Sequence, residues 1–203
     1  MYTLVVYSVY MVASLTPKKI VKAGRRLLDA EGADAVTMRR VAKGAGITPM
    51  AIYRHFSDRD ALLHALADEG FVELAARLRR ISTSGPVEDR LLRLGLVFLD
   101  HALENPGLFE LMFLQPRTGA RRFPKDFEAG ESPTANVVAE AVRAGMQSGV
   151  FRKDDVWEIV FEFGALSHGM IMLFLGGRMG IAEAHFRKFY SQSFERYLRG
   201  IRK

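Results

Sequence analysis

The chain has 203 residues, of which 49% are hydrophobic and 26% charged, a composition typical of one or two soluble globular domains. It contains no cysteine, which excludes disulfides, thiolate metal sites and cysteine nucleophiles and is consistent with a reducing, cytoplasmic location. The net charge is +6, and the whole excess lies between residues 17 and 59, where ten Lys and Arg stand against four Asp and Glu. Such a basic cluster is typical of a protein that binds a polyanion.

The first fifteen residues, MYTLVVYSVYMVASL, are apolar and uncharged. They are fewer than the roughly 20 residues that a membrane span needs, and they lack the basic start of a signal peptide. Their Val, Tyr and Thr residues favour an extended piece or a loose N-terminal arm over residues 1–15. Met11 is an alternative initiator, so the sequence leaves open whether the first ten residues are genuine.

The first two predicted helices follow this arm. Thr16 followed by Pro17 is a helix-start signal, because a threonine side chain caps free N–H groups and proline suits the first turn. Apolar residues then recur at helical spacing until Gly32. Thr37 predicts the start of a second helix, which Gly46 is expected to end.

A third and a fourth helix start close together. Thr48 and Pro49 repeat the start signal and predict a helix of about two turns. Ser57 and Asp60 form a capping-box-like pair, which predicts that a longer fourth helix is capped by Ser57. The third helix is therefore short and lies between two turns.

The second and third helices fit a helix-turn-helix. Ala42, Gly46 and Ile52 lie four and six residues apart. The small alanine permits a close helix crossing, the glycine permits the turn, and the isoleucine is expected to face the core. With Ile52 inward, Met50 and Arg54 point outward, as a helix that reads the DNA major groove requires.

The segment TMRRVAKGAGITPMAIYRHFSDRDALLHAL, residues 37–66, resembles the DNA-binding region of the TetR family of transcriptional regulators. The resemblance covers residues 17 to 70 and implies an all-helical homodimer with a larger C-terminal effector domain. By position it implies phosphate contacts for Thr37, Tyr53, His55 and Arg59, where Arg59 replaces the more usual lysine. It implies major-groove contacts for Arg39, Pro49, Met50 and Ala51. Thr48, and Arg54 from the helix geometry, complete the predicted DNA-binding set.

The rest of the chain also has helical periodicity, so the predicted fold class is all-α with about nine helices. Further helices are predicted at 57–82, 86–103, 107–114, 134–148, 154–175 and 181–201. The Gly-, Pro- and charge-rich residues 115–133 are predicted to form a mobile loop. We divide the chain into an N-terminal arm (1–15), a three-helix helix-turn-helix DNA-binding domain (16–62) and an effector-binding and dimerisation domain (63–203).

The last two predicted helices carry apolar residues around their circumference, which favours burial on two faces and predicts that they form a homodimer interface. The C-terminal part is similar to a TetR subgroup with a Trp-His-Gly-like motif, here Ser167-His168-Gly169. Met and aromatic side chains suit an apolar ligand, although most of them suit a plain core equally well. The candidate effector contacts are His101, Phe109, Met112, Phe113, Trp157, Phe161, His168 and Met172.

These features favour a repressor that a small apolar or aromatic ligand releases from a palindromic operator. A constitutive DNA-binding protein without an effector is the alternative. An enzyme is not indicated, because paired carboxylates, a nucleophile elbow and metal-ligand spacing are all missing from the sequence. His101 and Glu104 are three residues apart but have no further ligand cluster nearby, so neither a metal nor a cofactor is expected.

Overall fold

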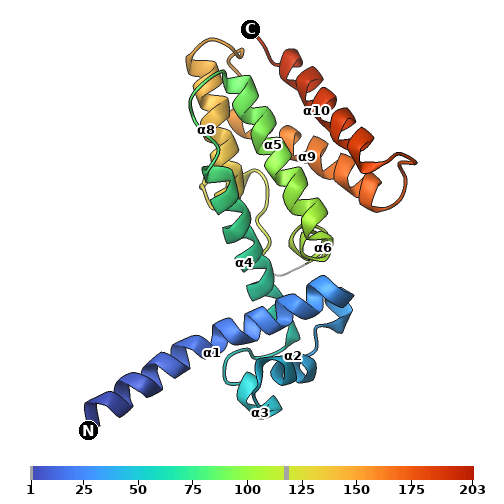
Figure 1. The fold of residues 1–203 in the computed structure, drawn as a ribbon. Coiled ribbons are helices and arrows are strands. Elements are labelled where there is room, and N and C mark those ends of the chain that lie inside the picture. Colours follow the sequence, from blue (N-terminus) through green and yellow to red (C-terminus); the bar gives the residue numbers. More distant parts are fainter. Residues whose placement is uncertain (1, 117–118) are drawn as a thin grey trace. The chain divides into compact units, whose positions relative to one another are not determined.

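The computed structural model describes residues 2–116 and 119–203, with side chains from residue 16 onward. These residues contain ten α-helices and one 3₁₀ helix joined by turns and loops, which confirms the predicted all-α fold class (Figure 1). The elements are α1 (Tyr2–Glu31), η1 (Ala33–Ala35), α2 (Met38–Ala45), α3 (Pro49–Ile52), α4 (Arg59–Arg79), α5 (Val87–Glu104), α6 (Pro106–Phe113), α7 (Lys125–Glu128), α8 (Pro133–Gln147), α9 (Val156–Leu175) and α10 (Glu183–Gly200).

The chain forms two compact units, each discontinuous in sequence. The first unit is Met1–Gly70 with Asn105–Arg117, and the second is Phe71–Glu104 with Thr118–Lys203. The helix α4 therefore contributes its first part to one unit and its last part to the other. The domain limits predicted from the sequence, with a boundary after residue 62 inside α4, stay a prediction.

In the first unit, α1, α2, α3 and the start of α4 surround one apolar core, against which α6 also packs. Fully or almost fully buried side chains come from each of these helices: Ile20, Leu28, Val41, Ile52, Leu62, Leu66, Leu108 and Phe109. Each such side chain contributes about 1.5–3 kcal/mol when it is fully buried. Gly70 permits the close approach of α6 to α4, since a Cβ there would lie 2.5 Å from the sulfur of Met112.

The first helix differs from the prediction. α1 is continuous from Tyr2 to Glu31, so Pro17 lies inside it and Thr16 is not its N-cap. The extended conformation predicted for the N-terminal segment is therefore wrong for residues 2–15. These residues contain neither Gly nor Pro. Extending an existing helix costs less than starting one, so the β propensity of Val and Tyr did not decide their conformation.

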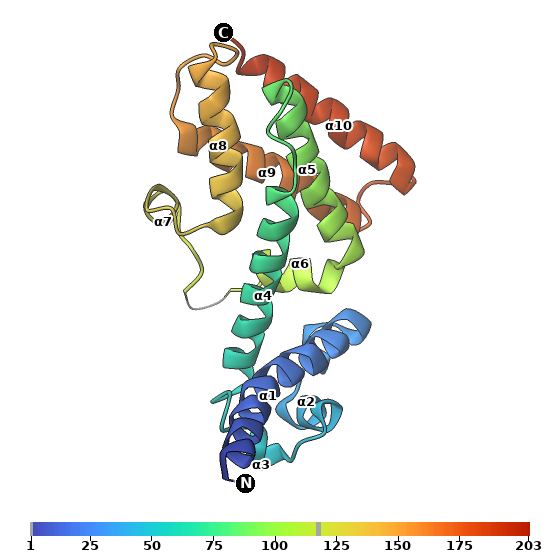
Figure 2. The same ribbon diagram turned by 60° about the vertical axis from the view of Figure 1, so that its left-hand side comes forward.

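In the second unit, α5 packs against α8, α9 and α10, and α9 packs against α8 and α10 (Figure 2). Tyr190 on α10 is completely buried, and its hydroxyl donates a hydrogen bond to the carbonyl oxygen of Gly95 at 2.9 Å. The hydroxyl of Ser167 on α9 lies 2.5 Å from the same phenol oxygen. Burial raises the pKa of Tyr190 far above its usual range, so the phenol stays protonated as this donor. One buried hydroxyl thus joins α5, α9 and α10.

The segment predicted as a mobile loop, residues 115–133, contains the short helix α7, and residues 117–118 lie outside the described residues. The rest of the segment contacts α9 through aromatic rings. The ring centroids of Phe123 and Phe161 are 4.4 Å apart. Those of Phe127 and Trp157 are 6.5 Å apart, with the two rings edge to face. These contacts give the segment a defined packing partner, while its mobility stays a prediction.

Two different faces of α9 are apolar. Side chains such as Phe163 and Ile171 are buried inside the chain, whereas Phe161, Met172 and Leu173 are exposed. Among the described residues, α9 is also the one helix long and apolar enough to cross a membrane by length and composition, and 33% of its apolar stretch is buried. The core helix of a soluble protein passes the same test of length and composition, so one such helix is weak evidence for a membrane span.

Candidate nucleic-acid interface

The helix α2 has the bounds that its sequence predicts. The side-chain oxygen of Thr37 accepts a hydrogen bond from the N–H of Arg40 at 3.3 Å, which satisfies a free donor of the first turn. Gly46 ends the helix in the left-handed conformation, with φ of 70°, where a Cβ would be strained. The N–H of Ile47 then donates to the carbonyl oxygen of Ala42 at 3.0 Å and closes the turn.

The helix α3 is shorter than predicted. The side-chain oxygen of Thr48 accepts a hydrogen bond from the N–H of Ala51 at 3.2 Å, and Pro49 occupies the first turn, as expected. The helix ends at Ile52, after about one turn, and residues 53–55 form a turn of their own. Ile52 is completely buried, which confirms that it holds this helix against the core.

The ten residues predicted to contact DNA all lie at the surface. Eight are exposed, and Ala51 and Arg59 are partly exposed. Met50 is 74% exposed and Tyr53 is 52% exposed, on either side of the buried Ile52. Because neither Met50 nor Tyr53 contributes to the core, packing does not account for these two side chains, and their exposure fits a contact surface.

The start of α4 differs from the prediction at its cap. Ser57 was expected to cap this helix, but Asp58 does so: its carboxylate accepts a hydrogen bond from the N–H of Ala61 at 2.7 Å. Ser57 instead donates to the same carboxylate at 3.0 Å. The bond from Ala61 and then that from Ser57 lower the pKa of Asp58. An anionic cap already occupies this helix end, so the phosphate contacts expected here have to come from side chains.

Arg59 is held by the backbone of a distant turn. Its Nε donates to the carbonyl oxygen of Val36 at 2.9 Å, and one terminal nitrogen donates to that of Ala33 at 2.7 Å. A carboxylate oxygen of Asp34 lies 3.8 Å away. A guanidinium has five N–H donors, so several stay available to a phosphate after these two bonds form. Arg59 therefore links the start of α4 to the turn before α2.

The positive charges on α2 and after α3 differ in their partners. Arg40 is paired with Glu31, with an N–O distance of 2.5 Å. Arg39, Lys43 and Arg54 are exposed and form no ion pair within the described residues. Lys43 is not among the predicted DNA contacts, although it belongs to the basic cluster between residues 17 and 59, which could have suggested a contact with phosphate. The unpaired cations give the exposed side of the helix-turn-helix a positive charge suited to phosphates.

Two family models match the chain, one described as bacterial regulatory proteins, tetR family (residues 20–66), and one as the tetracyclin repressor-like C-terminal domain (residues 91–200). The second match alone spans more than half of the 203 residues. The chain belongs to the TetR family. Its N-terminal part matches the domain that the family model describes as bacterial regulatory proteins, and the relatives below are named as HTH-type transcriptional regulators.

Individual relatives agree with this TetR assignment. The chain is 30% identical over 101 residues to an uncharacterised HTH-type transcriptional regulator of Bacillus subtilis, covering 50% of this chain and 53% of that protein. It is 30% identical over 141 residues to an HTH-type transcriptional regulator of Mycobacterium bovis, covering 68% and 60%. The matches thus span between half and two thirds of these relatives. A solved structure of a protein of unknown function from Rhodococcus sp. RHA1 matches with 26% identity and a TM-score of 0.77, over 93% of this chain and 96% of that one.

The eight predicted effector contacts of this TetR-family chain are divided between the two units. Phe109, Met112 and Phe113 lie on α6 in the first unit, where Phe109 and Met112 are buried in the core. The other five lie on α5 and α9 in the second unit. Of these, Phe161 and Met172 are exposed, and Trp157 is partly exposed beneath the guanidinium of Arg143.

The two predicted histidines occupy different environments. His101 is completely buried on α5, and its neighbour Glu104 accepts a hydrogen bond from Arg77 at 2.7 Å. Nδ1 of His168 lies 2.7 Å from the carbonyl oxygen of Gly164, which only accepts, so Nδ1 carries the proton. Burial lowers the pKa of His168, which favours the neutral ring with Nε2 as an acceptor. His168 is therefore a satisfied histidine, and its contact with a ligand stays a prediction.

Proposed function

We propose that this chain is a repressor that binds a palindromic operator as a homodimer in the cytoplasm and that a small apolar or aromatic ligand releases it. The observation that carries the proposal is α3, a one-turn helix with Ile52 in the core and Met50 and Tyr53 exposed. A single helix of this size contacts only a few base pairs. Two copies related by symmetry are needed for useful specificity, so the operator is expected to be palindromic.

The proposed DNA contacts follow from exposure and chemistry. Arg54, in the turn after α3, and Arg39 on α2 are exposed cations that suit guanine edges in the major groove. The hydroxyls of Thr37 and Tyr53 and the ring of His55 suit phosphate oxygens. Thr48, Pro49, Met50 and Ala51 form the part of α3 that enters the groove, and Arg59 reaches a phosphate with the donors that its backbone contacts leave over.

The proposed homodimer uses α9 and α10. Leu173 on α9 is 49% exposed, and Phe161 on the same helix and Phe189 on α10 are also exposed. Burying these side chains against a second copy removes apolar surface from water, and pairing two helices from each chain is a self-complementary solution. A chain truncated after Gly180 lacks α10. If that chain stays folded and dimeric in sedimentation, this interface is wrong.

The proposed effector site uses the aromatic side chains of α9, with His168 as a polar contact and the 115–133 segment as the entry. The helix α4 is continuous over 21 residues, with Arg59 at its start, so a tilt of this helix changes the position of the DNA-binding residues. A difference in ligand affinity of about 1–3 kcal/mol between two states weakens operator binding by roughly 5- to 150-fold. Only such a difference is needed for release.

The DNA-binding part is tested by selecting an operator from random duplexes and measuring the affinity of variants. Arg54→Ala should lose about 1–3 kcal/mol on the operator and less on random DNA, because a lost base contact reduces specificity. Tyr53→Phe should weaken both DNAs alike, because a phosphate contact carries no sequence information. Equal losses on operator and random DNA for Arg54→Ala would show that Arg54 does not read a base.

The effector part is tested by native mass spectrometry of the purified protein, followed by operator binding with and without any co-purified ligand. We expect one ligand per chain and weaker operator binding when it is present. A ligand that binds stoichiometrically but leaves operator affinity unchanged at several salt concentrations would overturn the effector mechanism. The alternative, a constitutive DNA-binding protein without an effector, would then replace the proposal.

A further inference from the structure

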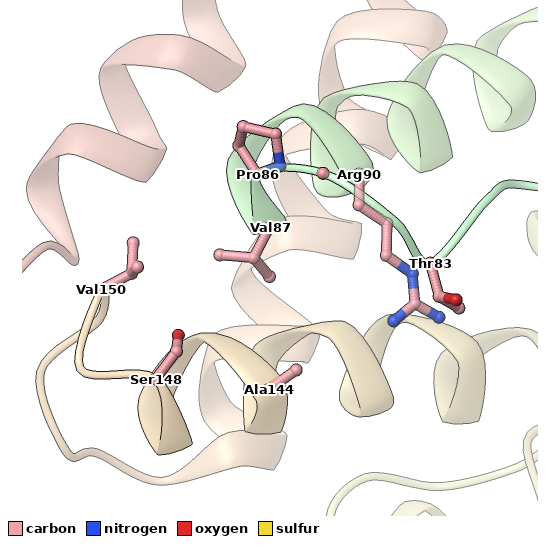
Figure 3. Close-up of a pocket in the computed structure, with 8 residues that line it drawn as sticks. Thr83, Pro86, Val87, Arg90, Ala144, Ser148 and Val150 are labelled. Carbon is pink, nitrogen blue, oxygen red and sulfur yellow. The ribbon is translucent and has the colours of Figure 1, made fainter.

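A shallow pocket with a volume of about 330 Å³ lies at the N-terminal end of α5, entirely within the second unit (Figure 3). The turn before α5, the first turn of α5 and the end of α8 form its walls. Its lining residues include Thr83, Pro86, Val87, Arg90, Ala144, Ser148 and Val150. None of the eight predicted effector contacts is among its lining residues, so this pocket is separate from the effector site proposed above.

Arg90 is the unusual member of this lining. It is only 9% exposed, and its Nε is buried without a hydrogen-bond partner among the described residues. Figure 3 shows its guanidinium extending from α5 toward α8, beside Thr83. An arginine always carries its charge, and a buried donor without an acceptor costs free energy. This Nε is covered by the protein itself, so the N–H donors available to an acceptor in the pocket are those of the two terminal nitrogens.

The neighbouring carboxylates leave Arg90 incompletely neutralised. The nearest is Glu140 on α8, whose oxygen lies 3.7 Å from a terminal nitrogen of Arg90, too far for a hydrogen bond, and whose side chain is 65% exposed. Glu88 accepts a hydrogen bond from Arg202 at 2.6 Å and is neutralised there. The C-terminal end of α8 also favours a cation nearby. That attraction explains the charge of Arg90 but leaves its Nε without an acceptor.

The pocket also faces the N-terminal end of α5, where the N–H groups of the first turn have no acceptor within the helix. This end of an 18-residue helix carries a partial positive charge, which Glu88 and Asp89 in its first turn already complement in part. The hydroxyls of Thr83 and Ser148 add two further polar groups. The remaining walls are aliphatic, formed by Pro86, Val87, Ala144 and Val150, so the pocket combines one cationic group with an apolar surface.

We propose that this pocket binds a small organic acid whose carboxylate accepts hydrogen bonds from Arg90 and whose apolar part contacts Val87 and Ala144. The planar guanidinium matches a carboxylate geometrically, because two parallel N–H groups meet its two oxygens. The volume of the pocket is at the lower end for small-molecule sites, which fits a compact acid. A bare oxyanion such as phosphate shares the charge but leaves the aliphatic walls unused.

Isothermal titration calorimetry of the full chain tests the proposal with benzoate, acetate, inorganic phosphate and the neutral benzamide as probes. Benzoate should bind saturably and more tightly than acetate or phosphate. Benzamide, which matches benzoate in shape, should bind about tenfold more weakly or not at all, because it lacks the charge that Arg90 pairs with. Saturable binding of phosphate alone, or equal binding of benzamide and benzoate, would overturn the proposal.

Variants locate the binding in this pocket. Arg90→Gln should weaken benzoate binding about tenfold or more, whereas Arg93→Gln, an exposed arginine on the same helix, should leave it unchanged. Ala144→Leu fills the pocket from an exposed position without changing charge and should abolish binding even if Arg90→Gln fails to fold. Glu140→Gln removes the competing carboxylate and should tighten binding. Benzoate affinity that neither Ala144→Leu nor Glu140→Gln changes would place the binding elsewhere and refute the site.

Discussion

Arg59 has two roles that its replacement can tell apart: it stabilises the fold through bonds to backbone oxygens, and it is proposed to contact a DNA phosphate. Its guanidinium donates to the carbonyl oxygens of Val36 and Ala33 at 2.9 and 2.7 Å, across 23 and 26 residues of sequence. A hydrogen bond from a charged group contributes about 1.5–3 kcal/mol when it is protected from water. The Arg59 side chain is 38% exposed, so water competes for both bonds. We therefore expect Arg59→Met to lower the free energy of unfolding by about 1–2 kcal/mol in total.

Arg59→Lys provides the matched comparison. A lysine keeps the positive charge, but its single ammonium group does not reproduce the planar fork that reaches two carbonyl oxygens together. It should therefore lose about half of the stability that Arg59→Met loses, while its attraction for a phosphate is retained. Arg39→Met is the control for stability. Arg39 is exposed, so its loss should change the free energy of unfolding by less than about 0.5 kcal/mol.

Two measurements decide between the roles. Urea unfolding followed by far-UV circular dichroism gives the free energy of unfolding of each variant. Operator titrations at several salt concentrations give the slope of log affinity against log salt, which falls by about one when a phosphate contact is lost. If Arg59→Met reduces that slope by about one and leaves the unfolding free energy within about 0.5 kcal/mol of the parent chain, the two backbone contacts contribute nothing and the reasoning is refuted.

Three further predictions concern the second unit. Gly145→Ala should lower the free energy of unfolding by about 1–3 kcal/mol, because the added Cβ would overlap the buried ring of Phe151. Gly164→Ala is the control: a Cβ there has no neighbouring atom within 4 Å, so this variant should not destabilise the chain. Urea unfolding measures both. Burial lowers the pKa of His168 below 6.5 in the folded chain. As the pH falls, the imidazole is therefore protonated in the unfolded chain before it is protonated in the folded chain. Stability should therefore fall as the pH drops below about 6.5, and His168→Gln should reduce that dependence in unfolding curves measured across this range. Leu173→Glu should shift the proposed dimer toward monomer in sedimentation equilibrium, and an unchanged dimer would exclude the α9 interface.

Local sequence signals predicted the helix-turn-helix well. Thr37 and Thr48 cap their helices, Gly46 ends α2 in the left-handed conformation, and Ile52 is buried, all as expected. These features depend on residues within one or two turns of each other, so spacing alone specifies them. The predicted cap of α4 was wrong. Ser57 and Asp58 are both good N-cap residues, and the sequence does not show which of them lies at the helix end.

The sequence by itself determined the fold class, the DNA-binding segment and the chemistry of its exposed side chains, because helix periodicity, caps and charge clusters are local properties. The tertiary structure decided which long-range partners those side chains find. Arg59 meets the backbone of residues 33–36 only after the chain folds back. Arg90 resembles any surface arginine in the sequence. It becomes a buried donor beside a pocket only because α5 packs against α8, and no periodicity within α5 specifies what covers it.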